Sequence, residues 1–130
     1  MREKLEEIME AVWRAEENQE YSVDLIKRRC ATDIAEEDLA ELEGQGFLVR
    51  TGGKVLFTEK GKALAGTIVR RHRLAEVLLN SILKLKDARA DEIACKVEHT
   101  LLPEVEEAIC TLLGHPRVCP YGNPIPQGTC

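Results

Sequence analysis

Aromatic side chains are scarce in this sequence. Its 130 residues include one Trp, two Tyr and two Phe, so aromatics make up 4% of the chain. Hydrophobic residues nevertheless reach 44%, which is enough for a packed fold. The core must therefore be mostly aliphatic, and the 32% of charged residues favours amphipathic helices around it.

Long apolar runs are also missing. No window approaches the roughly 18 consecutive apolar residues that a membrane span requires, and the N-terminal MREKLEEIMEAVW is charged and amphipathic rather than a secretory signal. The five cysteines are odd in number and dispersed, which argues against a disulfide framework. We therefore expect a cytoplasmic protein with reduced thiols and no membrane partner.

The motifs of common enzyme classes are not found. The sequence contains no His-Glu-x-x-His, no Glu-x-x-His of the di-iron bundles, no glycine-rich phosphate loop and no nucleophile elbow. We therefore expect no enzymatic activity.

A surplus of positive charge is missing too, since the formal net charge is −5. A nucleic-acid binder with this charge would need its basic residues clustered locally.

Helical spacing dominates the N-terminal half. Apolar residues recur every three to four positions over 2–17, Ser22 is a good N-cap for a helix over 23–30, and Asp33 with Glu36 resembles a capping box for a third helix over 33–44. Two β-prone runs then flank Gly52-Gly53, which predicts a hairpin. Three helices and a hairpin are the order of a winged helix-turn-helix. The alternative is a small helical domain with a hairpin and no role in DNA binding.

The C-terminal half is also predicted to be helical. Helices are expected over 58–83, 91–99 and 103–113, and the rest is rich in Pro and Gly. The predicted fold class is therefore mainly α. The apolar stripe of the 58–83 helix is large enough to form a dimer interface, so a homodimer is expected. We predict a winged helix-turn-helix domain over 1–66, a helical metal-binding and dimerisation domain over 67–118, and a Pro/Gly/Cys tail over 119–130.

Metal-binding residue types share one helix face. Asp91, Cys95, Glu98 and His99 are spaced i, i+4, i+7 and i+8, which aligns them on an α-helix. His72 and Glu76 form a second pair at i, i+4. Carboxylate, imidazole and thiol together suit a first-row transition metal rather than calcium or magnesium. Read singly, each has an ordinary alternative role: a buried thiol, a surface imidazole or a solvated carboxylate.

Four segments resemble a known family: RRHRLAEVLLNSIL, DEIACKVEHTL, PEVEEAI and YGNPIP. They are similar to the dimerisation domain of the DtxR/MntR family of metal-dependent transcriptional regulators. The helix-turn-helix and wing predicted before them fit the family's N-terminal domain. The resemblance does not extend to the family's C-terminal SH3-like domain, which we expect to be absent.

The resemblance implies a set of metal ligands. His72 and Glu76 match an ancillary site of the iron-dependent branch, where Asp91 replaces a histidine, and His72 also matches a manganese-branch ligand. Cys95, Glu98 and His99 match primary ligands, and Glu7 and Glu10 match helix-one positions that supply carboxylates in the manganese branch. From spacing alone, Glu7 and Glu10 form either a solvated acidic face or a ligand face. The cofactor is expected to be Fe(II), favoured by the Cys95 thiolate, or Mn(II), with Zn, Co or Ni as substitutes.

The expected function is that of a metal-dependent DNA-binding repressor of metal-ion homeostasis, acting as a homodimer on a double-stranded DNA operator. The candidate DNA contacts are Lys27, Arg28, Arg29, Ile34, Glu37, Arg50 and Lys54. The third helix is acidic, and a cluster of carboxylates should weaken binding to phosphates. The alternative function is a metal-binding winged-helix dimer that acts on a protein partner.

Cys110, Cys119 and Cys130 lie in or near the tail. They are either free thiols of a loop that packs on the dimer, which we favour, or a second thiolate site for zinc or an iron–sulfur cluster. Their wide spacing does not resemble the close cysteine pairs of such sites.

Overall fold

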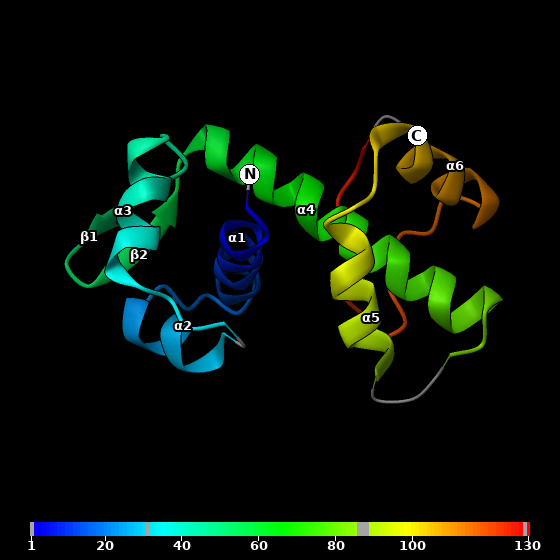
Figure 1. Ribbon diagram of the computed structural model, residues 1–130, viewed down its shortest axis with the longest axis horizontal. Helices are drawn as coiled ribbons and strands as arrows, with labels where there is room; N and C mark the ends of the chain where they lie inside the picture. Colours follow the sequence, from blue (N-terminus) through cyan, green and yellow to red (C-terminus); the bar gives the residue numbers. More distant parts are fainter. Residues whose placement is uncertain (1, 31, 86–88, 129) are drawn as a thin grey trace. The chain divides into compact units, whose positions relative to one another are not determined.

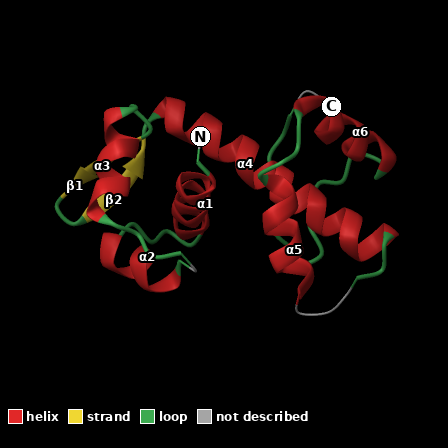
Figure 2. Ribbon diagram, in the orientation of Figure 1, coloured by secondary structure: helices red, strands yellow, loops and turns green. Residues whose placement is uncertain are grey.

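The computed structural model describes residues 2–30, 32–85, 89–128 and 130 (Figures 1 and 2). It divides into two compact units, residues 1–66 and 67–130, and the division falls within helix α4 (Glu59–Val77). No helix in the described ranges is long and apolar enough to cross a membrane.

The first unit contains three helices followed by a hairpin (Figure 1). The elements are α1 (Glu3–Glu17), α2 (Val23–Arg29), α3 (Glu36–Gly44), β1 (Leu48–Thr51) and β2 (Lys54–Phe57). Ser22 caps α2, because its Oγ accepts a hydrogen bond from the Leu25 N–H at 3.3 Å. The buried aliphatic side chains of this unit include Leu5, Ile8, Met9, Val12, Ile26, Leu39, Leu42, Leu48 and Val55.

The hairpin is the wing of a winged helix-turn-helix. β1 and β2 pair antiparallel with Thr51 opposite Lys54. The two-residue turn between them needs positive φ at both positions, and glycine supplies it: Gly52 has φ 56° and Gly53 has φ 78°. The Val55 N–H donates to the Tyr21 carbonyl at 2.9 Å, which ties the wing to the segment before α2.

Helix α3 begins later than the capping-box pattern predicts. The N-cap is Ala35 rather than Asp33, and the Asp38 carboxylate accepts a hydrogen bond from the Ala35 N–H at 3.0 Å. Lys4 Nζ lies 2.9 Å from the same carboxylate, and this contact lowers the pKa of Asp38. The prediction of an Asp33–Glu36 box was wrong because a lysine from α1 makes Asp38 the better partner for the helix start.

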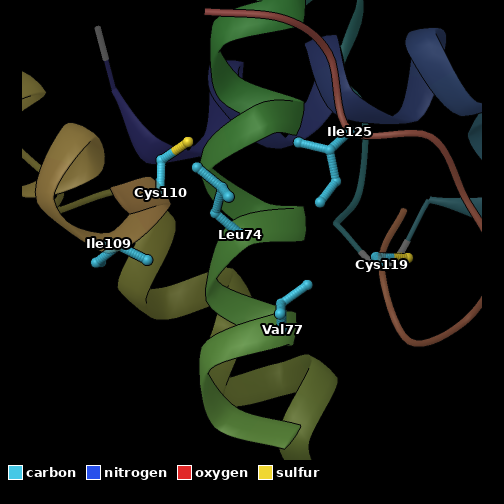
Figure 3. Close-up of a cluster of buried hydrophobic side chains, with 6 residues drawn as sticks. All are labelled: Leu74, Val77, Ile109, Cys110, Cys119 and Ile125. Atoms are coloured by element: carbon cyan, nitrogen blue, oxygen red, sulfur yellow. The ribbon is translucent and has the colours of Figure 1, made fainter. Parts of the chain in front are cut away.

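The second unit packs helices around two aliphatic clusters. It contains the end of α4, the π-helix η1 (Leu78–Ile82), α5 (Arg89–Glu98) and α6 (Pro103–Leu112). Ala75, Leu79 and Ala94 form the smaller cluster, where α4 and η1 meet α5. The larger cluster, drawn in Figure 3, comprises Leu74, Val77, Ile109, Cys110, Cys119 and Ile125.

Two expectations for this unit were wrong. The fourth helix was expected to remain α-helical to Leu83, but α4 ends at Val77 and the chain continues as η1, where the Leu83 N–H donates to the Leu78 carbonyl at 3.1 Å. Reduced thiols were expected throughout, but the structure joins Cys110 and Cys130 in a disulfide. Cys30, Cys95 and Cys119 lie outside this disulfide.

Candidate metal centre

Helices α4 and α5 bring four predicted ligands together around His72. Its Nδ1 lies 3.0 Å from Glu98 Oε1, and its Nε2 lies 3.0 Å from Asp91 Oδ1 and 3.5 Å from Glu76 Oε2. His72 and Glu98 are buried, whereas Asp91 is exposed. An imidazole with carboxylate oxygens beside both nitrogens can hydrogen-bond through both or bind a cation through one.

Cys95 and His99 form the second part of the centre. Cys95 Sγ lies 3.8 Å from His99 Nε2, which is also 3.8 Å from Glu98 Oε1. Cys95 is on α5, and His99 follows the last residue of that helix. Both side chains are partly buried, so the thiol and the imidazole face one carboxylate near the surface of the second unit.

Packing between α4 and α5 determines this geometry. Ala75 is on α4, three residues after His72, and Ala94 is on α5, one residue before Cys95. Both alanines are fully buried in the same cluster. The two helices meet at these small side chains, and the longer side chains of His72, Asp91 and Glu98 reach hydrogen-bond distance beside them.

Glu98 provides the clearest test of whether these residues suit a metal ion. Its side chain is fully buried, and its Oε2 has no hydrogen-bond partner among the described residues. A buried carboxylate oxygen normally has a donor or a cation beside it. Imidazole, carboxylate and thiol donors within a few ångströms of that oxygen fit a first-row transition metal.

Glu7 and Glu10 lie on α1 in the first unit. Glu7 accepts a hydrogen bond from the Thr32 hydroxyl, and Glu10 Oε1 lies 2.6 Å from an Arg14 nitrogen. Cys30 is close enough to be affected by both carboxylates. Burial raises the pKa of the Cys30 thiol, and the charges of Glu7 and Glu10 raise it further.

The predicted DNA-binding side chains differ in exposure. Lys27 on α2 is partly buried, and Arg28 and Arg29 are exposed. Arg29 is paired with Glu20. Ile34 precedes α3 and is partly buried, whereas Glu37 is exposed in the first turn of α3.

Carboxylates from α3 hold the wing arginine. Arg50 Nε donates to Glu43 Oε1 at 2.8 Å, and the Arg50 guanidinium also pairs with Glu36. This bonding raises the pKa of Arg50 and lowers that of Glu43. Lys54, at the start of β2, is exposed. The acidic helix thus neutralises one of the two predicted cations of the wing.

Sequence reasoning missed His115. The structure places its Nδ1 3.1 Å from Cys130 Sγ and 3.5 Å from Cys110 Sγ. Cys119 lies apart from Cys110 within the aliphatic cluster (Figure 3). A signal was available, because His115 follows Cys110 by five residues, just beyond the predicted end of the last helix. The partner Cys130 depends on the path of the tail, which spacing does not reveal.

Comparison with known proteins agrees with the predicted resemblance. Residues 58–127 match the family model for the iron-dependent repressor metal binding and dimerisation domain. The chain is 38% identical over 91 residues to the iron-dependent repressor IdeR of Mycobacterium tuberculosis and 36% identical over 91 residues to the diphtheria toxin repressor of Corynebacterium diphtheriae. Each match covers 69% of this chain and 40% of the relative, so the chain spans less than half the length of these relatives.

A solved structure shares the fold over most of the chain. A manganese-dependent transcriptional repressor in complex with manganese has a TM-score of 0.87 and 29% identity, over 95% of this chain and 59% of the other. The predicted mainly α winged-helix fold is therefore confirmed. Because the family model covers more than half of its length, the chain belongs to the DtxR family of iron-dependent repressors.

Proposed function

We propose that this protein is a metal-activated, DNA-binding transcriptional repressor of metal-ion homeostasis. The observation that carries the proposal is the buried pair of His72 and Glu98. His72 Nδ1 lies 3.0 Å from Glu98 Oε1, and the other oxygen of this carboxylate, Oε2, has no hydrogen-bond partner among the described residues. The pair belongs to the segment that matches the family's metal-binding domain. Such a protein acts in the cytoplasm, where it meets DNA.

Fe(II) or Mn(II) is the proposed cofactor. His72, Glu76 and Asp91 would hold one part of the ion's ligand set, and Cys95, Glu98 and His99 would hold another. The Cys95 thiolate favours Fe(II), and Zn(II), Co(II) or Ni(II) would also bind such donors. The sequence resemblance adds Glu7 and Glu10 as candidate carboxylate ligands. A bound cation would supply the positive charge that the orphaned Glu98 oxygen lacks.

Double-stranded DNA is the proposed partner of the winged helix-turn-helix. Lys27, Arg28, Arg29 and Lys54 would contact phosphates, and Ile34 and Glu37 lie at or near the start of the helix that would enter the major groove. Arg50 would contribute less, because Glu36 and Glu43 already bind its guanidinium.

A homodimer is the proposed assembly. The second unit exposes several large apolar side chains, which offer a second copy an apolar surface to bury. They are Ile82, Leu83, Leu85, Leu102, Val105 and Leu112. Two copies would present two winged helices, whose spacing must match one turn of the duplex.

The metal would act through a population shift. A metal ion shifts the equilibrium between two conformations of the protein only if it binds one of them more tightly. The ion must therefore bind the DNA-competent conformation more tightly than the other. Coupling of this kind typically amounts to about 1–3 kcal/mol. That range predicts a change in DNA affinity of about 5- to 150-fold on metal binding.

The acidic α3 favours a second candidate, a metal-binding winged-helix dimer that acts on a protein partner. Glu36 and Glu37 are exposed in the first turn of α3, where they would repel phosphates. An anaerobic gel shift distinguishes the two functions. The protein is incubated with its own upstream region and with a pool of genomic fragments, in Fe(II), Mn(II) or a chelator.

If the protein is a metal-activated repressor, it should retard a DNA fragment in the gel when the metal is present and should not do so when the chelator is present. Absence of a metal-dependent shift on every fragment would contradict it and leave the protein-partner candidate.

A further inference from the structure

A second cluster of metal-binding side chains lies at the end of α6. Cys110 is buried on α6, His115 lies in the turn that follows, and Cys130 is in the tail. His115 Nδ1 is 3.1 Å from Cys130 Sγ and 3.5 Å from Cys110 Sγ, and one donor atom from each residue lies within 4.8 Å of the others. None of the three residues belongs to the metal centre described above.

The backbone turns sharply to place the imidazole there. Gly114 has φ 76° and His115 has φ 56°, a conformation that residues other than glycine seldom adopt. The His115 N–H donates to the Cys110 carbonyl at 2.9 Å, and the Gly114 N–H donates to the Thr111 carbonyl at 3.1 Å. These bonds close the helix end and fold the ring back towards the sulfur of Cys110.

A disulfide alone does not account for this arrangement. The structure joins Cys110 to Cys130, and such a bond is complete without a third group. An imidazole nitrogen close to both sulfurs is the arrangement that a metal site with three protein donors requires. In tetrahedral zinc sites with Zn–S near 2.3 Å and Zn–N near 2.0 Å, sulfur and nitrogen lie roughly 3.5 Å apart. The two observed sulfur–nitrogen distances are close to this value.

We propose that, in the dithiol form, Cys110, His115 and Cys130 bind one Zn²⁺ ion. Each thiol loses its proton to solvent as the ion binds, and the imidazole binds as the neutral base. His115 and Cys130 are exposed, which leaves the fourth position open to water. The ion would fasten the tail to the end of α6 and so stabilise the second unit.

The nearby Cys119 offers a matched control. It is buried in the same aliphatic cluster as Cys110, but it lies apart from Cys110 in that cluster (Figure 3). It is a free thiol and belongs to none of the groups of candidate metal ligands found among the described residues. Replacing it by serine removes a buried thiol while leaving the proposed ligands in place.

The test uses the full chain with Cys95→Ser, so that the metal centre carries no thiolate. Protein purified under a phosphine reductant is titrated with Co²⁺, whose thiolate charge-transfer band reports sulfur ligands, and is analysed for zinc after dialysis. Three further substitutions are compared in this background: Cys130→Ser, His115→Asn, which tolerates the positive φ, and Cys119→Ser. Circular dichroism checks that each variant folds.

The proposal predicts a cobalt–thiolate band and retained zinc in the Cys95→Ser background. Cys119→Ser should keep both, Cys130→Ser should lose the band and retain one equivalent of zinc fewer than its background, and His115→Asn should weaken zinc binding at this site more than about tenfold. A folded Cys130→Ser variant with the same band and zinc content as its background would overturn the proposal. So would a fully reduced protein that shows no cobalt–thiolate band, because the two cysteines would then serve only as a disulfide.

Discussion

Among the proposed ligands, Cys95 is the one expected to influence metal preference most. The other donors are imidazoles and carboxylates, which suit manganese and iron alike, whereas a thiolate favours the softer ion. Its sulfur lies 3.8 Å from His99 Nε2 and its side chain is partly buried, so it is placed with the other ligands rather than within an aliphatic cluster.

Replacing Cys95 by alanine should therefore weaken Fe(II) binding well over tenfold, because it would remove one of the proposed direct ligands. Loss of a supporting contact alone typically costs a factor of 10 to 100. Anaerobic calorimetry measures the affinity, with Cys119→Ala as the control for loss of a thiol elsewhere in the same unit. Unchanged affinity would show that Cys95 is only a packing residue.

Cys30 should behave as a poorly reactive thiol. Burial raises its pKa above the ordinary value of 9.0, and the negative charges of Glu7 and Glu10 act in the same direction. Since only the thiolate reacts, alkylation of native Cys30 should reach half of its maximal rate above pH 9.0. Mass spectrometry of the Cys30 peptide after iodoacetamide pulses measures this rate. The same peptide in urea is the control, and equal pH profiles in both states would refute the shift.

Helix α4 depends on one glycine and tolerates another. A side chain at Gly61 would collide with the backbone carbonyl of Phe47, because α4 begins directly beside the chain that enters β1. At Gly66 the added atom would meet only the Trp13 ring, at an ordinary 3.5 Å. The start of α4 is therefore packed against the wing more closely than any side chain allows.

Gly61→Ala should lower the free energy of unfolding by about 1–3 kcal/mol, the usual cost of an overpacked site. Gly66→Ala is the matched control and should be neutral or stabilise by up to about 1 kcal/mol, since alanine is the better helix former. Urea denaturation measures both. Equal stability of the two variants would contradict the close contact at Phe47.

The pairing between α3 and the wing should limit DNA binding. Glu43→Gln removes a carboxylate that holds Arg50, so it should raise DNA affinity several-fold and steepen the salt dependence by about one unit of slope. Fluorescence anisotropy at several salt concentrations measures both. Glu41→Gln makes the same charge change on the same helix, but Glu41 pairs with Arg2. An equal gain in both variants would indicate general charge rather than release of Arg50.

Periodicity, capping and turn residues predicted the helices and the hairpin correctly where neighbouring residues in the sequence determine where an element ends. Ser22 and the Gly52-Gly53 turn are examples, and both are confirmed. The start of α3 was not predictable, because Lys4 of another helix selects Asp38. The change to a π-helix after Val77 was missed because the apolar spacing continues through it.

The sequence predicted the residues of the candidate site where helical spacing decides their positions. Helical spacing placed Asp91, Cys95, Glu98 and His99 on one face and paired His72 with Glu76, and the resemblance matched these residues to metal ligands of the family. The approach of α4 to α5, which brings His72 within 3.0 Å of Glu98, depends on tertiary packing of alanines that no local pattern reveals. The meeting of Cys110, His115 and Cys130 likewise depends on the path of the tail.

Taken together, the two units combine a DNA-binding type of domain with a metal-binding one. The first carries the winged helix-turn-helix, and the second carries buried candidate metal ligands and exposed apolar side chains. Their linkage is the central claim: metal affinity and DNA affinity should depend on each other. By thermodynamic reciprocity, a ligand substitution that abolishes metal binding must also abolish the effect of metal on DNA binding.

The most direct test measures the anaerobic affinity for a labelled upstream DNA fragment by fluorescence anisotropy. It compares the wild-type chain with His72→Ala, each with saturating Fe(II) and with a chelator. We predict that Fe(II) tightens wild-type binding at least about tenfold, and that His72→Ala binds with the same weak affinity in both conditions. Equal wild-type affinity with and without Fe(II), or an undiminished Fe(II) effect in folded His72→Ala, would contradict the account.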